Sequence, residues 1–175
     1  FTTIQDAIDA SSNGDEIIVH PGTYTNIGSW VFNPNGKAIW IHSSAGANTT
    51  VVSGEGLRRV AWISNGETST TIIEGFTFTY GLGGLFCASS PKLLDCVFAN
   101  NVNPGGSGGG VYCSTGSPIF ENCSFYENAA GTGGGLSLSA GVVTLLNCVF
   151  SGNTATYGGG AVDMSFGSPI LTGCI

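Results

Sequence analysis

The sequence predicts an all-β fold in which about seven short coils stack into a solenoid, preceded by one short helix. A unit of 25 residues recurs in the second half of the chain: residues 108–132 and 133–157 are two copies, and a third begins at Gly158. Apolar residues in each unit are spaced by two, which is typical of a strand that shows one face to a core. A single unit cannot bury that face, so the units must stack, and seven coils with strands ~4.8 Å apart give a rod about 30–35 Å long.

The first element is a short helix within residues 1–14, which we expect to cap the first coil. Thr2 or Thr3 can cap its N-terminus, and Ile4, Ala7 and Ile8 share one face. Gly14 is expected to end it. One helix before a solenoid fits a lid over the open end of its core.

The remaining chain divides into irregular coils in residues 15–80 and regular repeats of about 25 residues in 81–175. Within the irregular part, "DEIIVHPGTY" (15–24) and "KAIWIHSSAG" (37–46) are expected to be strands followed by turns. Residues 1–175 therefore form a single predicted domain, which we expect to be a fragment of a longer or assembling protein.

Three columns of the repeat are restricted in residue type. One holds only glycine, asparagine and aspartate, which tolerate a left-handed backbone, so each unit should turn there. This turn column comprises Gly75, Asp95, Asn122, Asn147 and Gly173. The predicted core columns follow it: Cys96, Cys123, Cys148 and Cys174, then Phe78, Phe98, Phe125 and Phe150. A further inward strand is expected at Leu85/Cys87, Val111/Cys113 and Leu136/Leu138, and Ala161/Asp163 breaks its pattern.

The six cysteines allow two interpretations. An even number invites a disulfide framework, and neighbouring coils would bring Cα atoms within disulfide range. However, the cysteine columns also hold phenylalanine and leucine, which favours free, buried thiols that pack as small hydrophobic groups.

Composition excludes several partners. Only 4 lysines and arginines face 11 carboxylates, which gives a net charge of −7 and makes nucleic-acid binding unlikely. No apolar run approaches the ~18 residues of a membrane-spanning helix, so membrane insertion is not expected.

The stretch "FTTIQDAIDASSNGDEIIVHPGTYTN" resembles the entrance to right-handed parallel β-helices of the pectin-lyase-like superfamily. The units with "GGG", "SPIFENCSFYEN" and an Asn-Cys-x-Phe core resemble the repeats of polymorphic-outer-membrane-protein-type β-helices. The resemblance implies a right-handed parallel β-helix over the whole chain and a location outside the cell or on its surface. It leaves activity open, because the superfamily contains lyases, hydrolases, adhesins and inert scaffolds.

The resemblance also tells which catalytic residues to look for. Lyases of the superfamily use an arginine or lysine base, usually beside a carboxylate-bound Ca²⁺, but no aspartate cluster lies near Lys37, Arg58, Arg59 or Lys92. The strongest carboxylate group is Glu74 and Glu121, two coils or about 10 Å apart, with Asp95 between them. These three are weak candidates for Ca²⁺ ligands or an acid–base pair. We therefore assign no catalytic residue, and Ca²⁺ is the only cofactor considered.

Tyr112, Tyr126 and Tyr157 are expected to face outward, where sugar rings could stack on them. No continuous aromatic stripe is expected, because Tyr112 aligns with Phe86, Ser137 and Val162.

The sequence thus favours a non-catalytic, extracellular structural or adhesive module, for which a surface appendage or filament is one expected setting. The alternatives are a fragment of a carbohydrate-active enzyme, either a polysaccharide lyase or a glycoside hydrolase, and a binding module for neutral glycans. The expected partner is a set of further coils or another chain at the C-terminal end, because "SPILTGC" would expose an unpaired strand there.

Overall fold

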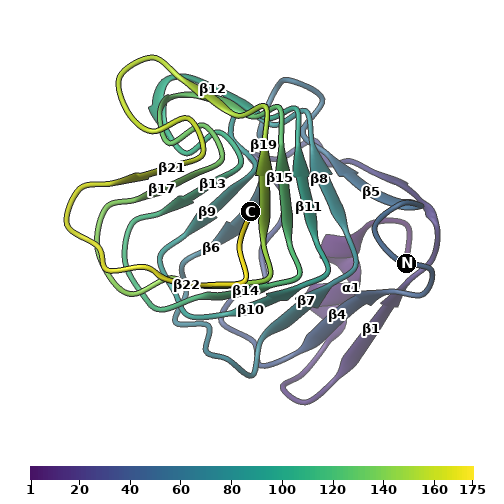
Figure 1. Cartoon of the computed structure of the whole chain (residues 1–175). Helices are drawn as coiled ribbons and strands as arrows, with labels where there is room; N and C mark the ends of the chain where they lie inside the picture. Colours follow the sequence, from purple (N-terminus) through teal and green to yellow (C-terminus); the bar gives the residue numbers. More distant parts are fainter.

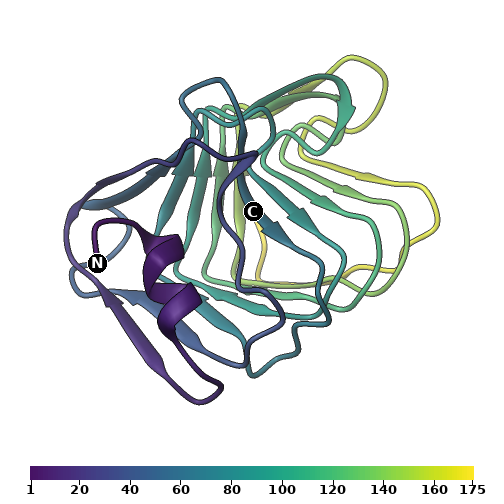
Figure 2. The same cartoon turned by 180° about the vertical axis from the view of Figure 1, so that it is seen from behind.

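The computed structural model describes residues 1–175 as a parallel β-helix with one short helix at its N-terminal end (Figures 1 and 2). Four parallel sheets run along the stack, with seven, six, six and three strands. The seven strands of the longest sheet enclose six turns, which agrees with the predicted solenoid of about seven coils.

Each sheet collects one strand from successive coils. Sheet A contains β1 (Glu16–Val19), β4 (Trp40–Ser43), β7 (Ile72–Glu74), β10 (Lys92–Leu94), β14 (Ile119–Glu121), β18 (Thr144–Leu146) and β22 (Ile170–Thr172). Sheet B contains β2 (Gly22–Tyr24), β5 (Thr50–Ser53), β8 (Thr77–Thr79), β11 (Val97–Ala99), β15 (Ser124–Tyr126) and β19 (Val149–Ser151). Sheet C contains β3 (Trp30–Phe32), β6 (Arg59–Ile63), β9 (Leu85–Cys87), β13 (Val111–Cys113), β17 (Leu136–Leu138) and β21 (Val162–Met164). The short sheet D contains β12 (Val102–Ser107), β16 (Ala129–Thr132) and β20 (Thr154–Ala155).

The helix α1 (Ile4–Ala10) lies across the end of the stack (Figure 2). The Thr3 hydroxyl accepts a hydrogen bond from the Asp6 amide at 3.0 Å, and Ile4 and Ile8 are buried. The helix ends at Ala10, with Ser11 as its C-cap, and so stops before the predicted Gly14. Its last carbonyls are satisfied by the Lys37 ammonium, which donates to the carbonyls of Ile8 and Ser11, so no glycine is needed there.

The core contains a ladder of phenylalanine rings. Phe78, Phe98 and Phe125 are fully buried, and Phe150 continues the column at the last coil. Successive ring centroids are 4.9, 5.1 and 4.4 Å apart, with interplanar angles of 10°, 13° and 3°. Because the strands are in register, identical side chains of successive coils stack face to face.

The turn column has the backbone that its residue types tolerate. Its five members have φ between 50° and 74°, in the left-handed region. They are Gly75, Asp95, Asn122, Asn147 and Gly173.

Asparagines close the corner between sheets B and D. The Asn101 amide group donates to the Phe78 carbonyl and to the Asn128 side chain, both at 3.0 Å. Asn128 repeats this one coil later, donating to Phe98 and Asn153. Asn101 and Asn128 are fully buried, so these bonds satisfy polar groups that water cannot reach.

The glycines that open each repeat allow the coils to approach closely. A Cβ atom on Gly109 would lie 2.5 Å from the Gly134 carbonyl oxygen, and one on Gly110 would lie 2.6 Å from that of Gly135. No side chain fits there, which explains why the unit keeps Gly-Gly-Gly.

The register of the last coil corrects one alignment. Val162 and Met164 pair with Leu136 and Leu138, so the inward strand continues and Ala161/Asp163 is not its break. Ala161 is an extra residue between the last glycine of the triplet and the strand, and it shifts the pattern by one. The partner of Ser137 is consequently Asp163 rather than Val162.

All six cysteines are free thiols, and five of them are buried. A hydrogen bond with Cys87 and burial raise the pKa of the Cys113 thiol. Burial also raises the pKa of Cys123, whereas a hydrogen bond from Cys123 lowers the pKa of Cys148 to about 7. These thiols pack inside the core as small hydrophobic groups.

Candidate functional site

The three weak calcium candidates do not gather into a site. Glu74 and Glu121 lie in one column of sheet A, with Leu94 between them. The Glu74 carboxylate instead accepts a hydrogen bond from the Trp40 indole at 3.0 Å. Asp95 lies in the turn that follows Leu94 at the end of β10. The structure contains no group of three or more histidine, cysteine, aspartate or glutamate side chains arranged to hold a metal ion.

The cations are dispersed as well. Arg58 pairs with Glu55 and donates from Nε to the Gly28 carbonyl at 3.1 Å. Arg59 packs against Gly83, and desolvation lowers its pKa while nearby Tyr112 raises it. The Arg58–Glu55 pair is the one salt bridge between an arginine or lysine and a carboxylate side chain.

An aromatic stripe runs along sheet C, contrary to the expectation that none exists. Ring centroids are 5.5 Å apart for Trp30–Trp62, 4.0 Å for Trp62–Phe86 and 5.7 Å for Phe86–Tyr112. The alignment of the irregular coils missed Trp30 and Trp62, which precede the regular repeats. The stripe ends where Ser137 and Asp163 continue the column.

This stripe offers little face area to a sugar. The first three rings stack with interplanar angles of 26° and 17°, so each covers a face of the next. Tyr112 is half-buried and meets Phe86 edge-on at 63°. Stacking of this kind stabilises the packing of the coils at the outer surface of sheet C.

The other two tyrosine candidates lie apart from Tyr112. Tyr126, at the end of β15, is 37% exposed, and Tyr157, in the loop after β20, is 82% exposed. The three tyrosines belong to sheet C, sheet B and a loop, so they do not form one binding surface.

The outer face of sheet A carries a cluster of aromatic and carboxylate side chains that the sequence did not reveal. Trp40 is 39% exposed and stacks on His42 with centroids 4.2 Å apart. His42 Nε2 lies 2.8 Å from a carboxylate oxygen of Glu16, and Glu74 accepts from the Trp40 indole. One signal could have revealed this cluster. Trp40 and His42 alternate on one strand and so share its outer face, and His42 pairs with Glu74 of the next coil.

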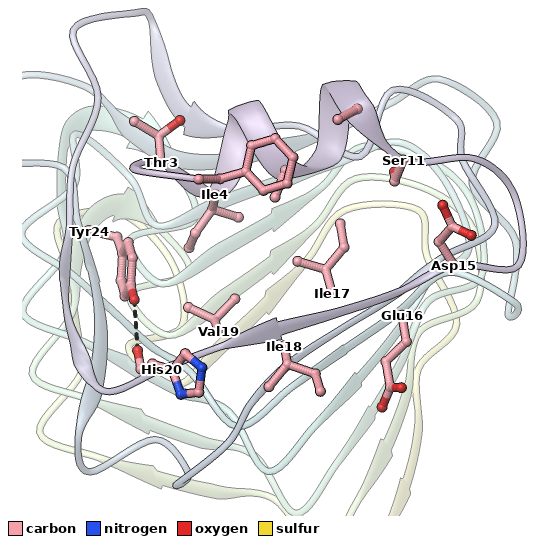
Figure 3. A pocket seen from close by; sticks show the side chains of 13 residues that line it. Thr3, Ile4, Ser11, Asp15, Glu16, Ile17, Ile18, Val19, His20 and Tyr24 are labelled. Atoms are coloured by element: carbon pink, nitrogen blue, oxygen red, sulfur yellow. Dashed lines mark hydrogen bonds between the residues drawn. The ribbon is translucent and has the colours of Figure 1, made fainter.

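A groove of about 450 Å³ lies between α1 and β1 (Figure 3). Its walls combine apolar side chains of the helix and strand, such as Ile4, Ala7 and Val19, with Asp15 and Glu16 at one end. At the other end, the Tyr24 hydroxyl donates to the His20 carbonyl at 2.8 Å. The groove belongs to the N-terminal end of the stack, where the sequence suggested only a lid.

The family model of the Chlamydia polymorphic membrane protein (Chlamydia_PMP) repeat matches residues 147–163. The match begins at Asn147 in the turn column, includes Cys148 and Phe150 of the core, and ends at Asp163 in β21. No curated protein and no solved structure matches the chain significantly. These findings support a β-solenoid with polymorphic-membrane-protein-like repeats, and the likeness to the pectin-lyase-like superfamily stays a prediction. No helix of the chain could span a membrane.

Proposed function

We propose that this chain is a non-catalytic wall segment of a cell-surface protein, which holds outward-facing loops and edges away from the cell as a structural or adhesive module. One observation carries the proposal. Residues kept from coil to coil serve the interior and corners, as in the columns of Phe78 and Asn101, while the outward positions change. The polymorphic-membrane-protein repeat at 147–163 supports a location on the cell surface.

The dispersal of charged groups supports a non-catalytic role. Glu74 binds an indole, Arg58 pairs with Glu55, and Lys37 caps a helix. Each of these side chains thus has a structural partner. Catalysis of glycan cleavage needs two carboxylates, or a base and a carboxylate, around one substrate position.

The C-terminal face of the stack supports further coils or another chain as the partner. The edge strand β22 has no neighbour on its outer side, and the apolar side chains of Ile170 and Leu171 are about half exposed. Phe166 and Ile175, near the C-terminal end of the chain, are almost fully exposed. An unpaired edge with an apolar rim pairs readily with another strand.

Glycan binding is the second candidate, and Trp40 favours it. Its indole is 39% exposed, and Glu16 and Glu74 lie near it as hydrogen-bond acceptors for sugar hydroxyls. A neutral-glycan array tests this candidate: Trp40→Ala should abolish any specific signal, and Tyr157→Ala should not.

The proposed role is tested on cells that produce the protein. Antibodies raised against the exposed segment 156–168 should label intact cells, and externally added protease should remove the label. Labelling only after permeabilisation would contradict surface display. Release of reducing ends or unsaturated uronides from pectin, alginate or neutral glycans, lost in Glu74→Gln or Arg58→Ala, would contradict the non-catalytic role.

A further inference from the structure

The N-terminal end of sheet A has a free strand edge. β1 is the terminal strand of the sheet and pairs only with β4. The carbonyls of Asp15 and Val19 accept hydrogen bonds from Trp40 and Ser44, so these alternate residues direct their backbone groups toward β4. In a parallel pairing the intervening residues direct theirs the other way, and Glu16 and Ile18 therefore present N–H and C=O groups on the open edge.

The groove beside that edge has room for side chains. On the side of α1, the lining includes the small residues Ala7 and Ala10 beside Ile4. Ile17 and Val19 of the strand point toward the helix (Figure 3). Phe1 lines the entrance and is almost fully exposed. A segment that paired with β1 would place every second side chain against this apolar lining.

The charge around the groove favours a basic partner. Asp15 and Glu16 line it, and Asp6 is exposed on α1. The ammonium of Lys37 is held by the carbonyls of Ile8 and Ser11 at the C-terminal end of α1. Glu16 contacts His42 through one oxygen, so the other oxygen is free to pair with a cation.

We propose that the α1–β1 groove binds an extended, basic segment of a partner protein, which adds to β1 as an extra strand of sheet A. Apolar side chains of the segment enter the groove, and alternate lysine or arginine side chains point outward to pair with Glu16. Backbone hydrogen bonds to Glu16 and Ile18 supply affinity, and the alternation of side chains supplies specificity. This site lies at the opposite end of the stack from the edge used in the proposed function and does not depend on it.

The test uses labelled octapeptides, acetylated and amidated, and fluorescence anisotropy with the whole chain. A peptide of alternating lysine and valine should bind saturably. A peptide of alternating glutamate and valine, and a lysine–valine peptide with alternate backbone N-methyl groups, should each bind at least tenfold more weakly. Equal binding of the N-methylated peptide would overturn strand addition, and equal binding of the acidic peptide would overturn the basic partner.

A matched pair of variants locates the site. Ile18 is 53% exposed, and its N–H faces the open edge, so Ile18→Pro removes one donor without breaking the pairing with β4. It should weaken binding at least tenfold, whereas Ile18→Thr, which keeps the N–H, should stay within threefold. Circular dichroism checks that both variants fold. If Ile18→Pro does not fold, the comparison with the N-methylated peptide decides whether the segment binds by strand addition. Unchanged affinity in a folded Ile18→Pro variant would overturn the proposal. Self-association of the chain that Ile18→Pro abolishes would also overturn it, because the occupant of the groove would then be a second copy of this chain.

Discussion

Removal of one ring from the phenylalanine ladder should destabilise the solenoid strongly. Phe125 is 0% exposed and lies between Phe98 and Phe150, with centroids 5.1 and 4.4 Å away. Phe120 meets its edge at 6.0 Å. A buried Phe→Ala change costs about 3–5 kcal/mol, and the loss of two stacked neighbours places Phe125→Ala at the upper end, about 4–5 kcal/mol.

Urea unfolding measures this loss. With a slope of about 2 kcal/mol per molar urea, the midpoint should fall by about 2 M. The matched control is Tyr126→Ala, one residue further along β15, whose side chain points outward and is 37% exposed; it should cost about 1 kcal/mol or less. Fluorescence and circular dichroism must give the same transition for the comparison to hold. Equal losses in the two variants would refute the assignment of inward and outward faces.

Three further outcomes follow from the interior and the corners. Asn128→Ala should cost about 1–3 kcal/mol, because it leaves the buried Asn101 backbone N–H without its acceptor and removes one donor from the Phe98 carbonyl. Hydrogen exchange at the Asn101 backbone N–H should accelerate, and unchanged exchange would contradict this. Gly110→Ala should cost about 1–3 kcal/mol in the same urea assay, because its Cβ would lie 2.6 Å from the Gly135 carbonyl oxygen. The control Gly28→Ala, whose Cβ would lie 3.5 Å from its nearest atom, should be nearly neutral, and equal effects of the two changes would contradict close packing of the coils. Hydrogen bonding and burial raise the pKa of Cys113 in the folded protein, so the unfolded chain loses the thiol proton at a lower pH. Stability should therefore fall as pH rises above the ordinary thiol pKa of about 8.5, and Cys113→Val should reduce the fall. An identical alkaline decline in the two proteins would contradict this prediction.

The sequence was most informative where the repeat is regular. Columns of residues such as Phe98 and Asn122 reported the core and the turns directly, because in a stacked solenoid equivalent residues occupy equivalent positions. One inserted residue, Ala161, was enough to shift the alignment of the last inward strand, since strand faces alternate with every residue.

The irregular coils hid the surface features. The stripe from Trp30 to Tyr112 and the group around Trp40 depend on the register between coils of unequal length, which no fixed period reveals. The α1–β1 groove depends on how the helix settles on the first coil, with Lys37 of the next coil holding its end. Such contacts are tertiary, and composition and spacing contain no direct signal for them.

The stacking of coils is tested most directly by one distance across the whole rod. Glu16 and Ile170 lie in one outward column of sheet A, six register steps apart. At ~4.8 Å per step, their Cα atoms should be about 29 Å apart. Double electron–electron resonance between nitroxides on Glu16→Cys and Ile170→Cys, in a background with the partly exposed Cys174 changed to Ser, measures this distance. A narrow distribution near 29 Å is predicted, and a broad one or a mean beyond about 40 Å would contradict the six-turn solenoid.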